Sequence, residues 1–90
     1  MMTSINFTCA VPENGGLRVP VQAIDARQAA CAFVHARWEH LNRPEQIVVR
    51  VDSDKCWYEI RVDAEPPIDP GEPESGIMFS GLLLRGGVFA

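Results

Sequence analysis

The chain has 90 residues, of which 47% are hydrophobic and 22% are charged, and its formal net charge is −4. This length and composition predict one globular domain and exclude both a two-domain protein and an extensively disordered one. No stretch approaches the roughly 20 apolar residues of a membrane span, and residues 1–10 lack the pattern of a secretory signal. We therefore expect a soluble, cytoplasmic protein.

Cys9, Cys31 and Cys56 are an odd number of cysteines, widely spaced and without a C-x-x-C pair. This pattern favours reduced, buried thiols over a disulfide framework, and it does not provide the spacing of a structural zinc site. We expect no disulfide, no metal and no cofactor.

Two strands are predicted before the helix. Apolar and polar residues alternate over residues 5–11, which is the period of a half-buried strand, and the Asn-Gly dipeptide within residues 12–16 favours a turn. A second strand follows over residues 17–23. Because Pro20 cannot donate a backbone hydrogen bond to a neighbouring strand, we expect this second strand at an edge of the sheet.

One helix is predicted to begin after Asp25. Asp25 is a favourable N-cap, and Gln28 three residues later completes a capping box. Apolar side chains then recur with helical spacing as far as Leu41. Asn42 and Pro44 are expected to end the helix.

A hairpin follows the helix. Residues 47–51 and 56–62 have the alternating pattern of strands and flank the polar turn at residues 52–55. The second face of this hairpin carries Trp57 among charged residues. The element order ββαββ predicts an α+β domain in which one helix covers one face of a mainly antiparallel sheet.

The composition changes after Val62. Residues 1–62 contain seven basic and seven acidic side chains, so the negative charge of the chain comes from the acidic, proline-rich residues 63–75, which we expect to form a stiff, solvated loop. Residues 76–90 are strongly apolar, with Arg85 as their one charged residue. They must be covered, and we expect a fifth strand that pairs within the same sheet or with a second copy.

The acidic segment has two interpretations. A concentrated negative strip attracts a basic protein surface, such as one that binds nucleic acid, whereas a linker uses its charges only to stay extended. Trp57 is a second candidate, because an indole among polar residues is typical of an interface anchor, although the tail or the loop could cover it. The predicted partner-binding residues are Trp57, Glu59, Asp63, Glu65, Asp69, Glu72 and Glu74.

The apolar tail provides a second possible interface. It could join a second copy or a different subunit by strand addition, which would make the chain an assembly protein and a homodimer. The residues predicted for self-association are Ile77, Phe79, Leu82 and Leu84.

Enzymatic chemistry is not expected. His35 and Glu39 lie one helical turn apart, but two groups do not make a metal site or a catalytic centre. The serines lack a G-x-S-x-G elbow, and Gly76 and Gly81 have the spacing of a phosphate-binding loop without its lysine. Direct nucleic-acid binding is disfavoured because the basic residues are dispersed and the net charge is negative. An active site could still be assembled across a dimer interface.

Residues 19–62 contain a strand, an alanine-rich helix capped by Asp25 and a two-strand hairpin. This arrangement resembles the compact one-helix architecture of small phage-encoded accessory proteins, of which the anti-CRISPR proteins are the best known. The resemblance covers about half of the chain and includes no diagnostic motif. It implies a host-directed inhibitor that blocks a nucleic-acid-binding complex by steric and electrostatic occlusion.

Neutralising Asp69, Glu72 and Glu74 together tests the electrostatic mechanism. If these carboxylates contact a basic partner, the triple amide variant should bind more weakly, and its affinity should depend less on salt because fewer charges are screened. Titrations at low and high ionic strength measure both effects. Unchanged affinity would contradict the mechanism.

Overall fold

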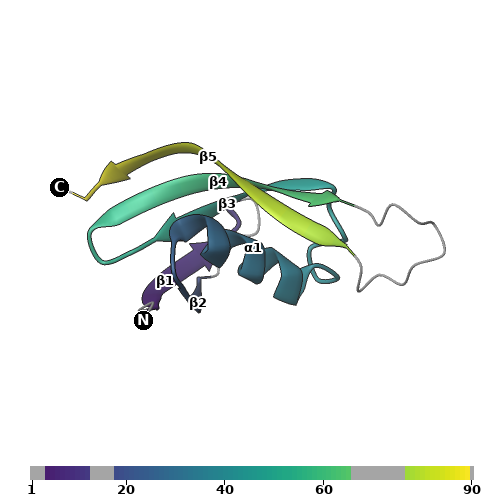
Figure 1. Cartoon of the computed structure of the whole chain (residues 1–90), viewed down its shortest axis with the longest axis horizontal. Helices are drawn as coiled ribbons and strands as arrows, with labels where there is room; N and C mark the ends of the chain where they lie inside the picture. Colours follow the sequence, from purple (N-terminus) through teal and green to yellow (C-terminus); the bar gives the residue numbers. More distant parts are fainter. Residues whose placement is uncertain (1–3, 13–17, 66–76, 90) are drawn as a thin grey trace.

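The structure is a computed structural model that describes residues 4–12, 18–65 and 77–89. Within these residues, five strands form one antiparallel sheet in the order β2-β1-β3-β4-β5, and one helix covers one of its faces (Figure 1). The predicted α+β class, with a ββαββ order and a fifth strand, is confirmed. The elements are β1 (Ile5–Ala10), β2 (Val19–Ala23), α1 (Ala26–Arg37), β3 (Gln46–Asp52), β4 (Cys56–Glu65) and β5 (Met78–Val88).

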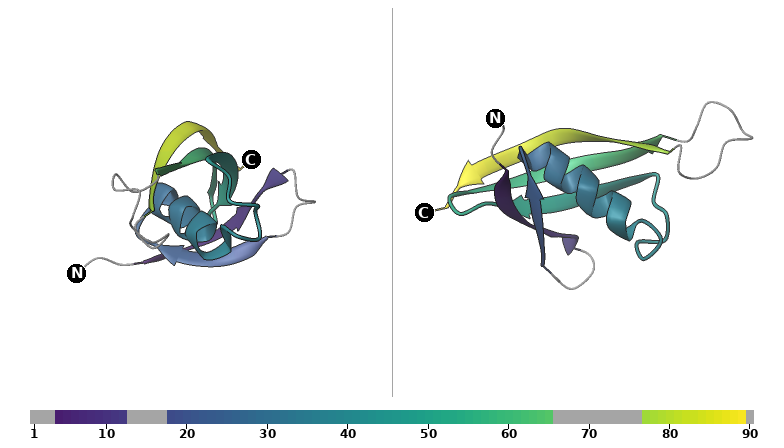
Figure 2. Two further views of the ribbon diagram at one scale, coloured as in Figure 1. Left: turned by 90° about the vertical axis from the view of Figure 1, so that its right-hand side faces the viewer. Right: turned by 60° about the horizontal axis from the view of Figure 1, so that its bottom comes forward.

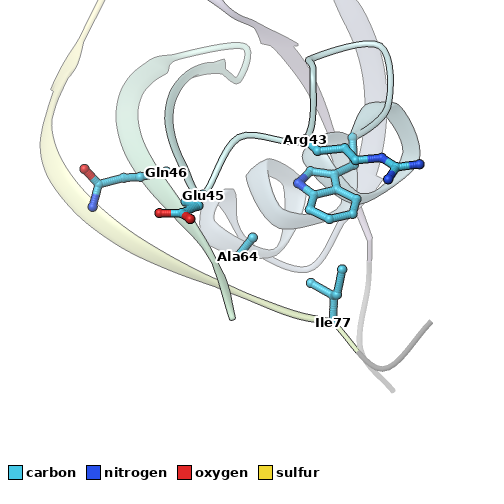
Figure 3. A pocket seen from close by; sticks show the side chains of 6 residues that line it. Arg43, Glu45, Gln46, Ala64 and Ile77 are labelled. Atoms are coloured by element: carbon cyan, nitrogen blue, oxygen red, sulfur yellow. The ribbon is translucent and has the colours of Figure 1, made fainter. Parts of the chain in front are cut away.

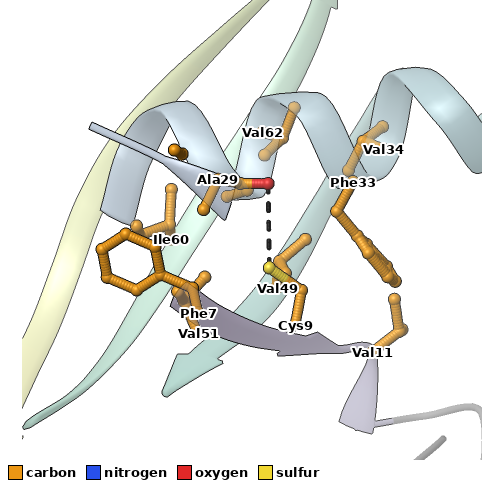
Figure 4. Packing of buried hydrophobic residues seen from close by; sticks show 12 residues of the cluster. Phe7, Cys9, Val11, Ala29, Phe33, Val34, Val49, Val51, Ile60 and Val62 are labelled. Carbon is orange, nitrogen blue, oxygen red and sulfur yellow. Dashed lines mark hydrogen bonds between the residues drawn. The ribbon is translucent and has the colours of Figure 1, made fainter. Parts of the chain in front are cut away.

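The core lies between α1 and the sheet (Figure 2). Alternation along β3 and β4 turns Val49, Val51, Ile60 and Val62 toward the helix, where they are fully buried. Each such side chain contributes on the order of 2 kcal/mol relative to an exposed one. The buried cluster comprises Phe7, Cys9, Val11, Ala23, Ala29, Ala30, Phe33, Val34, Val49, Val51, Ile60 and Val62 (Figure 4).

The start of α1 was predicted from Asp25, which is the N-cap. Its Oδ1 accepts a hydrogen bond from the Gln28 N–H at 2.7 Å. The Gln28 side chain reaches back to the N–H of Ile24 at 2.9 Å, and not to that of Asp25 as in a standard capping box. The two bonds fix the direction in which the chain passes from β2 into the helix.

The end of α1 was predicted too late. The helix stops at Arg37, and the chain then turns, with the N–H of Arg43 donating to the carbonyl of Trp38 at 2.8 Å. Asn42 and Arg43 have positive φ angles of 65° and 50°. The indole N–H of Trp38 donates to the carbonyl of Pro44 at 3.2 Å, which stabilises this turn. Asn42 and Pro44 therefore belong to the loop after the helix.

β4 extends past its predicted end at Val62. It continues through Glu65, because Asp63 pairs with Gln46 of β3 on one side and with Ser80 of β5 on the other. The beginning of the predicted acidic loop is therefore sheet. Three further acidic residues predicted to bind a partner lie outside the described residues, namely Asp69, Glu72 and Glu74.

β5 pairs antiparallel with β4 of its own chain, so the apolar tail completes its own sheet. Gly81 lets the strand pass close under α1, since a Cβ there would lie 3.3 Å from Sγ of Cys31 and 3.3 Å from Cγ2 of Ile60. The register shifts between Glu59 and Ile60, which leaves Leu84 as a bulge residue without a partner on β4.

Burial of Cys9 predicts a loss of stability at high pH. Burial, aided by the Asp52 carboxylate, raises the pKa of the Cys9 thiol from 9.0 to about 12. The thiol ionises more readily in the unfolded chain, so its contribution to stability is complete below about pH 9 and is lost as the pH rises toward about 12. The free energy of unfolding should fall by up to about 1.4 kcal/mol per pH unit in this window.

Denaturant unfolding at a series of pH values measures this dependence. Cys9→Ala should flatten the slope above pH 9 while lowering stability at neutral pH by about 1–2 kcal/mol, because it leaves a small cavity. Parallel pH dependences in the two proteins would contradict the assignment to Cys9.

Candidate functional site

The face of the sheet opposite α1, called the open face below, is polar along β3 and β4. Residues directly opposite each other on neighbouring strands share a face of the sheet. The strand register therefore assigns each side chain of these strands either to the helix side or to the open face. The open face of these two strands and of β5 includes Gln46, Val48, Arg50, Asp52, Trp57, Glu59, Arg61, Asp63, Leu82 and Arg85.

Charges on the open face are paired with one another. The ion pairs are Arg50 Nε to Asp52 Oδ1 at 2.8 Å, Arg61 Nε to Asp63 Oδ1 at 3.2 Å, and Arg85 Nη2 to Glu59 Oε1 at 2.6 Å. Ion pairs that remain in contact with solvent, as these partly exposed ones do, typically contribute no more than about 1 kcal/mol each. Their main consequence is that Glu59 and Asp63, both predicted to bind a basic partner, already have partners in their own chain.

Asp63 is held from two sides. Gln46 Nε2 donates to its Oδ1 at 2.9 Å, and Arg61 Nη2 donates to its Oδ2 at 3.3 Å. The Nε of Arg61 is close to Oδ1 but does not point at it, so this buried N–H makes no hydrogen bond. With both oxygens engaged, Asp63 is better placed to fix the end of β4 than to bind another molecule.

Glu59 and Arg85 link β4 to β5. Nε and Nη2 of Arg85 both donate to Oε1 of Glu59, at 2.9 and 2.6 Å. The hydrogen bond from Arg85 holds the pKa of Glu59 below its ordinary value, and the carboxylate in turn raises the pKa of Arg85. Both groups remain charged at neutral pH.

Trp57 lies among charges as predicted, but its ring is largely occupied by its own chain. The guanidinium carbon of Arg50 lies 4.5 Å from the ring centroid and that of Arg85 lies 5.8 Å away. The indole also lies over Gly87, where a Cβ would be 2.8 Å from Nε1. The sequence pattern placed Arg50 on the same face of the hairpin as Trp57, but it could not place Arg85 there, because β5 had to be in register with β4 before Arg85 met Trp57.

β5, whose outer edge is one end of the sheet, carries five of the nine exposed large hydrophobic side chains among the described residues. Met78 is 70% exposed, Val88 is 74% exposed, and Leu82, Leu83 and Leu84 are each nearly half exposed. No strand within the described residues pairs with this edge. Sequence reasoning selected Leu82 and Leu84 but missed Met78, Leu83 and Val88, although they belong to the same apolar run.

The other two residues predicted for self-association are less accessible. Phe79 is half-buried against α1, with its ring centroid 5.4 Å from that of His35 and 5.9 Å from that of Trp38. Ile77 lines a hollow of about 700 Å³ with Trp38, Arg43, Glu45, Gln46 and Ala64 (Figure 3). Of the four residues predicted for self-association, Leu82 and Leu84 therefore lie on the exposed edge, and Ile77 and Phe79 are partly buried.

Catalysis would need metal-ligating or nucleophilic side chains brought close together. No three His, Cys, Asp or Glu side chains among them lie close enough together to hold a metal ion. Burial raises the pKa of the Cys9 and Cys31 thiols, which disfavours the nucleophilic thiolate. The hollow in Figure 3 is lined by the Glu45 carboxylate, the Arg43 guanidinium and the Gln46 amide together with the apolar side chains of Ala64 and Ile77 and the indole of Trp38.

No model of a known protein family, no curated protein and no solved structure matches this chain. No helix in the described part of the chain is long and apolar enough to cross a membrane.

The Glu59 pair predicts a pH-dependent contribution to stability. Because its pKa is lowered in the folded protein, ionised Glu59 stabilises the fold above its ordinary pKa of 4.5, and this contribution is lost as the pH falls through the lower, folded-state pKa. Glu59→Gln should lower the melting temperature at neutral pH, and the difference from wild type should shrink in acid.

Thermal unfolding at neutral and acidic pH measures this difference. Glu65→Gln is the matched control, since it removes the same charge from the same strand at a position opposite Met78 instead of Arg85. Equal effects of the two substitutions at all pH values would show that the Arg85 contact does not stabilise the fold.

Proposed function

We propose that this chain is a non-enzymatic protein-binding module that pairs the outer edge of β5 with a strand of another protein chain. The observation that carries this proposal is an edge strand of 11 residues that presents exposed apolar side chains along its length. Strand addition at such an edge gains affinity from backbone hydrogen bonds and from the apolar side chains that become covered.

The two edges of the sheet support this assignment because they differ. β2 is 5 residues long and contains Pro20, which has no N–H to offer a neighbouring strand. β5 has 11 residues, contains neither proline nor lysine, and has Arg85 as its one charge. Folded proteins usually protect their edge strands with short length, charge, proline or a bulge. β5 has the bulge at Leu84 and the charge of Arg85, but its length and its exposed apolar side chains still favour an interface.

Exposed leucines at the middle of β5 give the edge its binding energy. Leu82, Leu83 and Leu84 are each nearly half exposed, and completing the burial of one such side chain contributes on the order of 1 kcal/mol. The three neighbouring leucines add apolar area that an incoming strand can cover, while the backbone fixes the direction of that strand.

Inhibition of a nucleic-acid-binding complex is a second candidate function. Its support is that Glu65, exposed at the end of β4, lies opposite Met78 at the start of β5, so that negative charge borders the apolar edge. A partner with basic residues beside an exposed strand would fit both features.

The free thiols Cys9, Cys31 and Cys56 support the proposed cytoplasmic location.

A pull-down with an edge-disrupted variant tests the proposed function. Leu82→Lys combined with Leu84→Lys places charges on the edge, which should abolish strand addition by requiring their desolvation. The lysate is prepared from cells that also express an untagged copy of the chain. Tagged wild-type protein should capture chains from this lysate that the tagged double variant does not capture.

Val48→Lys is the matched control, because Val48 is an exposed apolar residue on the open face of β3, away from the β5 edge. It should retain every captured chain. A captured set that is the same for wild type and the edge variant, with both folded by circular dichroism, would refute edge pairing. Loss of the captured chains in high salt would favour the inhibitor, because apolar edge pairing resists salt.

A further inference from the structure

We propose that the β5 edge is occupied by a second copy of this chain, and that the two copies are related by a two-fold axis passing between Leu83 and Leu84. This inference rests on the proposed function and names its partner. The two β5 strands would run antiparallel, and the two sheets would join into one continuous sheet with both helices on the same face.

The helix of each chain covers only the first half of its β5. Phe79 contacts His35 and Trp38, and Gly81 lies against Cys31 of α1. Beyond Leu83 the strand passes the start of the helix, and its end extends past α1 in Figure 1. Antiparallel pairing places the covered half of one copy beside the uncovered half of the other, so each helix covers what the partner leaves open.

The bulge at Leu84 restricts the register. Before the bulge, even-numbered residues such as Leu82 face the open side, and after it, odd-numbered residues such as Arg85 do so. Paired side chains must share a face, so an even-numbered residue of one copy must meet an odd-numbered residue of the other. An axis between Leu83 and Leu84 satisfies this condition along the whole strand and places the two bulges at the axis.

The pairs generated by this axis are chemically compatible. Val88, which is 74% exposed, meets Phe79 of the second copy, and Met78, which is 70% exposed, meets Phe89. Arg85 meets Leu82, so the one charged residue of β5 never opposes itself. The aligned strands would form about ten backbone hydrogen bonds, which is typical of a specific interface.

Sedimentation equilibrium of the full chain tests the proposal. Wild type and Val48→Lys should be dimeric at about 100 µM, whereas Leu82→Lys with Leu84→Lys should be monomeric at the same concentration. The net charge of −4 makes the copies repel, so added salt should preserve or tighten the dimer. A monomeric wild type, or a folded edge variant that remains dimeric, would overturn the proposal.

Two single substitutions test the register. Leu82→Lys would oppose Arg85 of the second copy, whereas Leu82→Glu would pair with it, although both lose the same apolar contact. The dimer dissociation constant of Leu82→Lys should exceed that of Leu82→Glu by on the order of tenfold. Equal dissociation constants would overturn the register.

Hydrogen exchange of wild type provides a measurement that does not depend on the folding of a variant. Outward amides of β5 should exchange more slowly at high than at low protein concentration, and concentration-independent exchange would overturn self-pairing. A monomeric wild type that still captures chains through the β5 edge would refute the second copy as partner and leave the proposed function intact.

Discussion

The antiparallel pairing of β4 with β5 is the interaction on which the other features of this domain depend. β4 is hydrogen-bonded on both sides, and its buried residues Ile60 and Val62 fill the space under α1. Opposite Val62, β5 supplies Gly81, and this absence of a side chain lets the helix approach the sheet. A larger residue there would separate the helix from the strand that completes the core.

The same pairing arranges the open face. Gly86 and Gly87 leave room for the rings of Tyr58 and Trp57, which lie over the two glycines, with Tyr58 on the helix side and Trp57 on the open side. Aromatic cover of glycine in a neighbouring strand offsets the missing side chains and helps to hold the register. Arg85 then donates to Glu59 on the neighbouring strand, so the charged side chains of the open face contact one another within the chain.

Local patterns were sufficient for most of the fold. Alternation identified the strands around Val49 and Ile60, Asp25 located the helix start, and Pro20 correctly placed its strand at an edge. The helix end was missed because α1 stops at Arg37 and a turn that contains Asn42 and Pro44 follows it, held by the hydrogen bond from the Trp38 indole to the Pro44 carbonyl. Asp63 was assigned to a loop because its strand partners are distant in the sequence.

The candidate site was less accessible to sequence reasoning, for a physical reason. Whether a carboxylate is available to a partner depends on the side chains beside it in the sheet, and Glu59 is paired by an arginine 26 residues away. The apolar run of β5 likewise gave no period, because a bulge at Leu84 reverses the alternation within the strand. Only the register separates Phe79, which serves the core, from Leu82, which does not.

Because of these contacts, the edge of β5 is the surface at which association would add the most favourable contacts. The charges of the open face already satisfy one another, so a partner that displaced them would have to replace existing ion pairs as well as cover polar surface. At the edge, an incoming strand meets exposed backbone and half-exposed leucines, and it breaks no contact of the folded chain. Because association there would add interactions without removing any, we propose the edge, ahead of Trp57 and the paired carboxylates, as the binding surface.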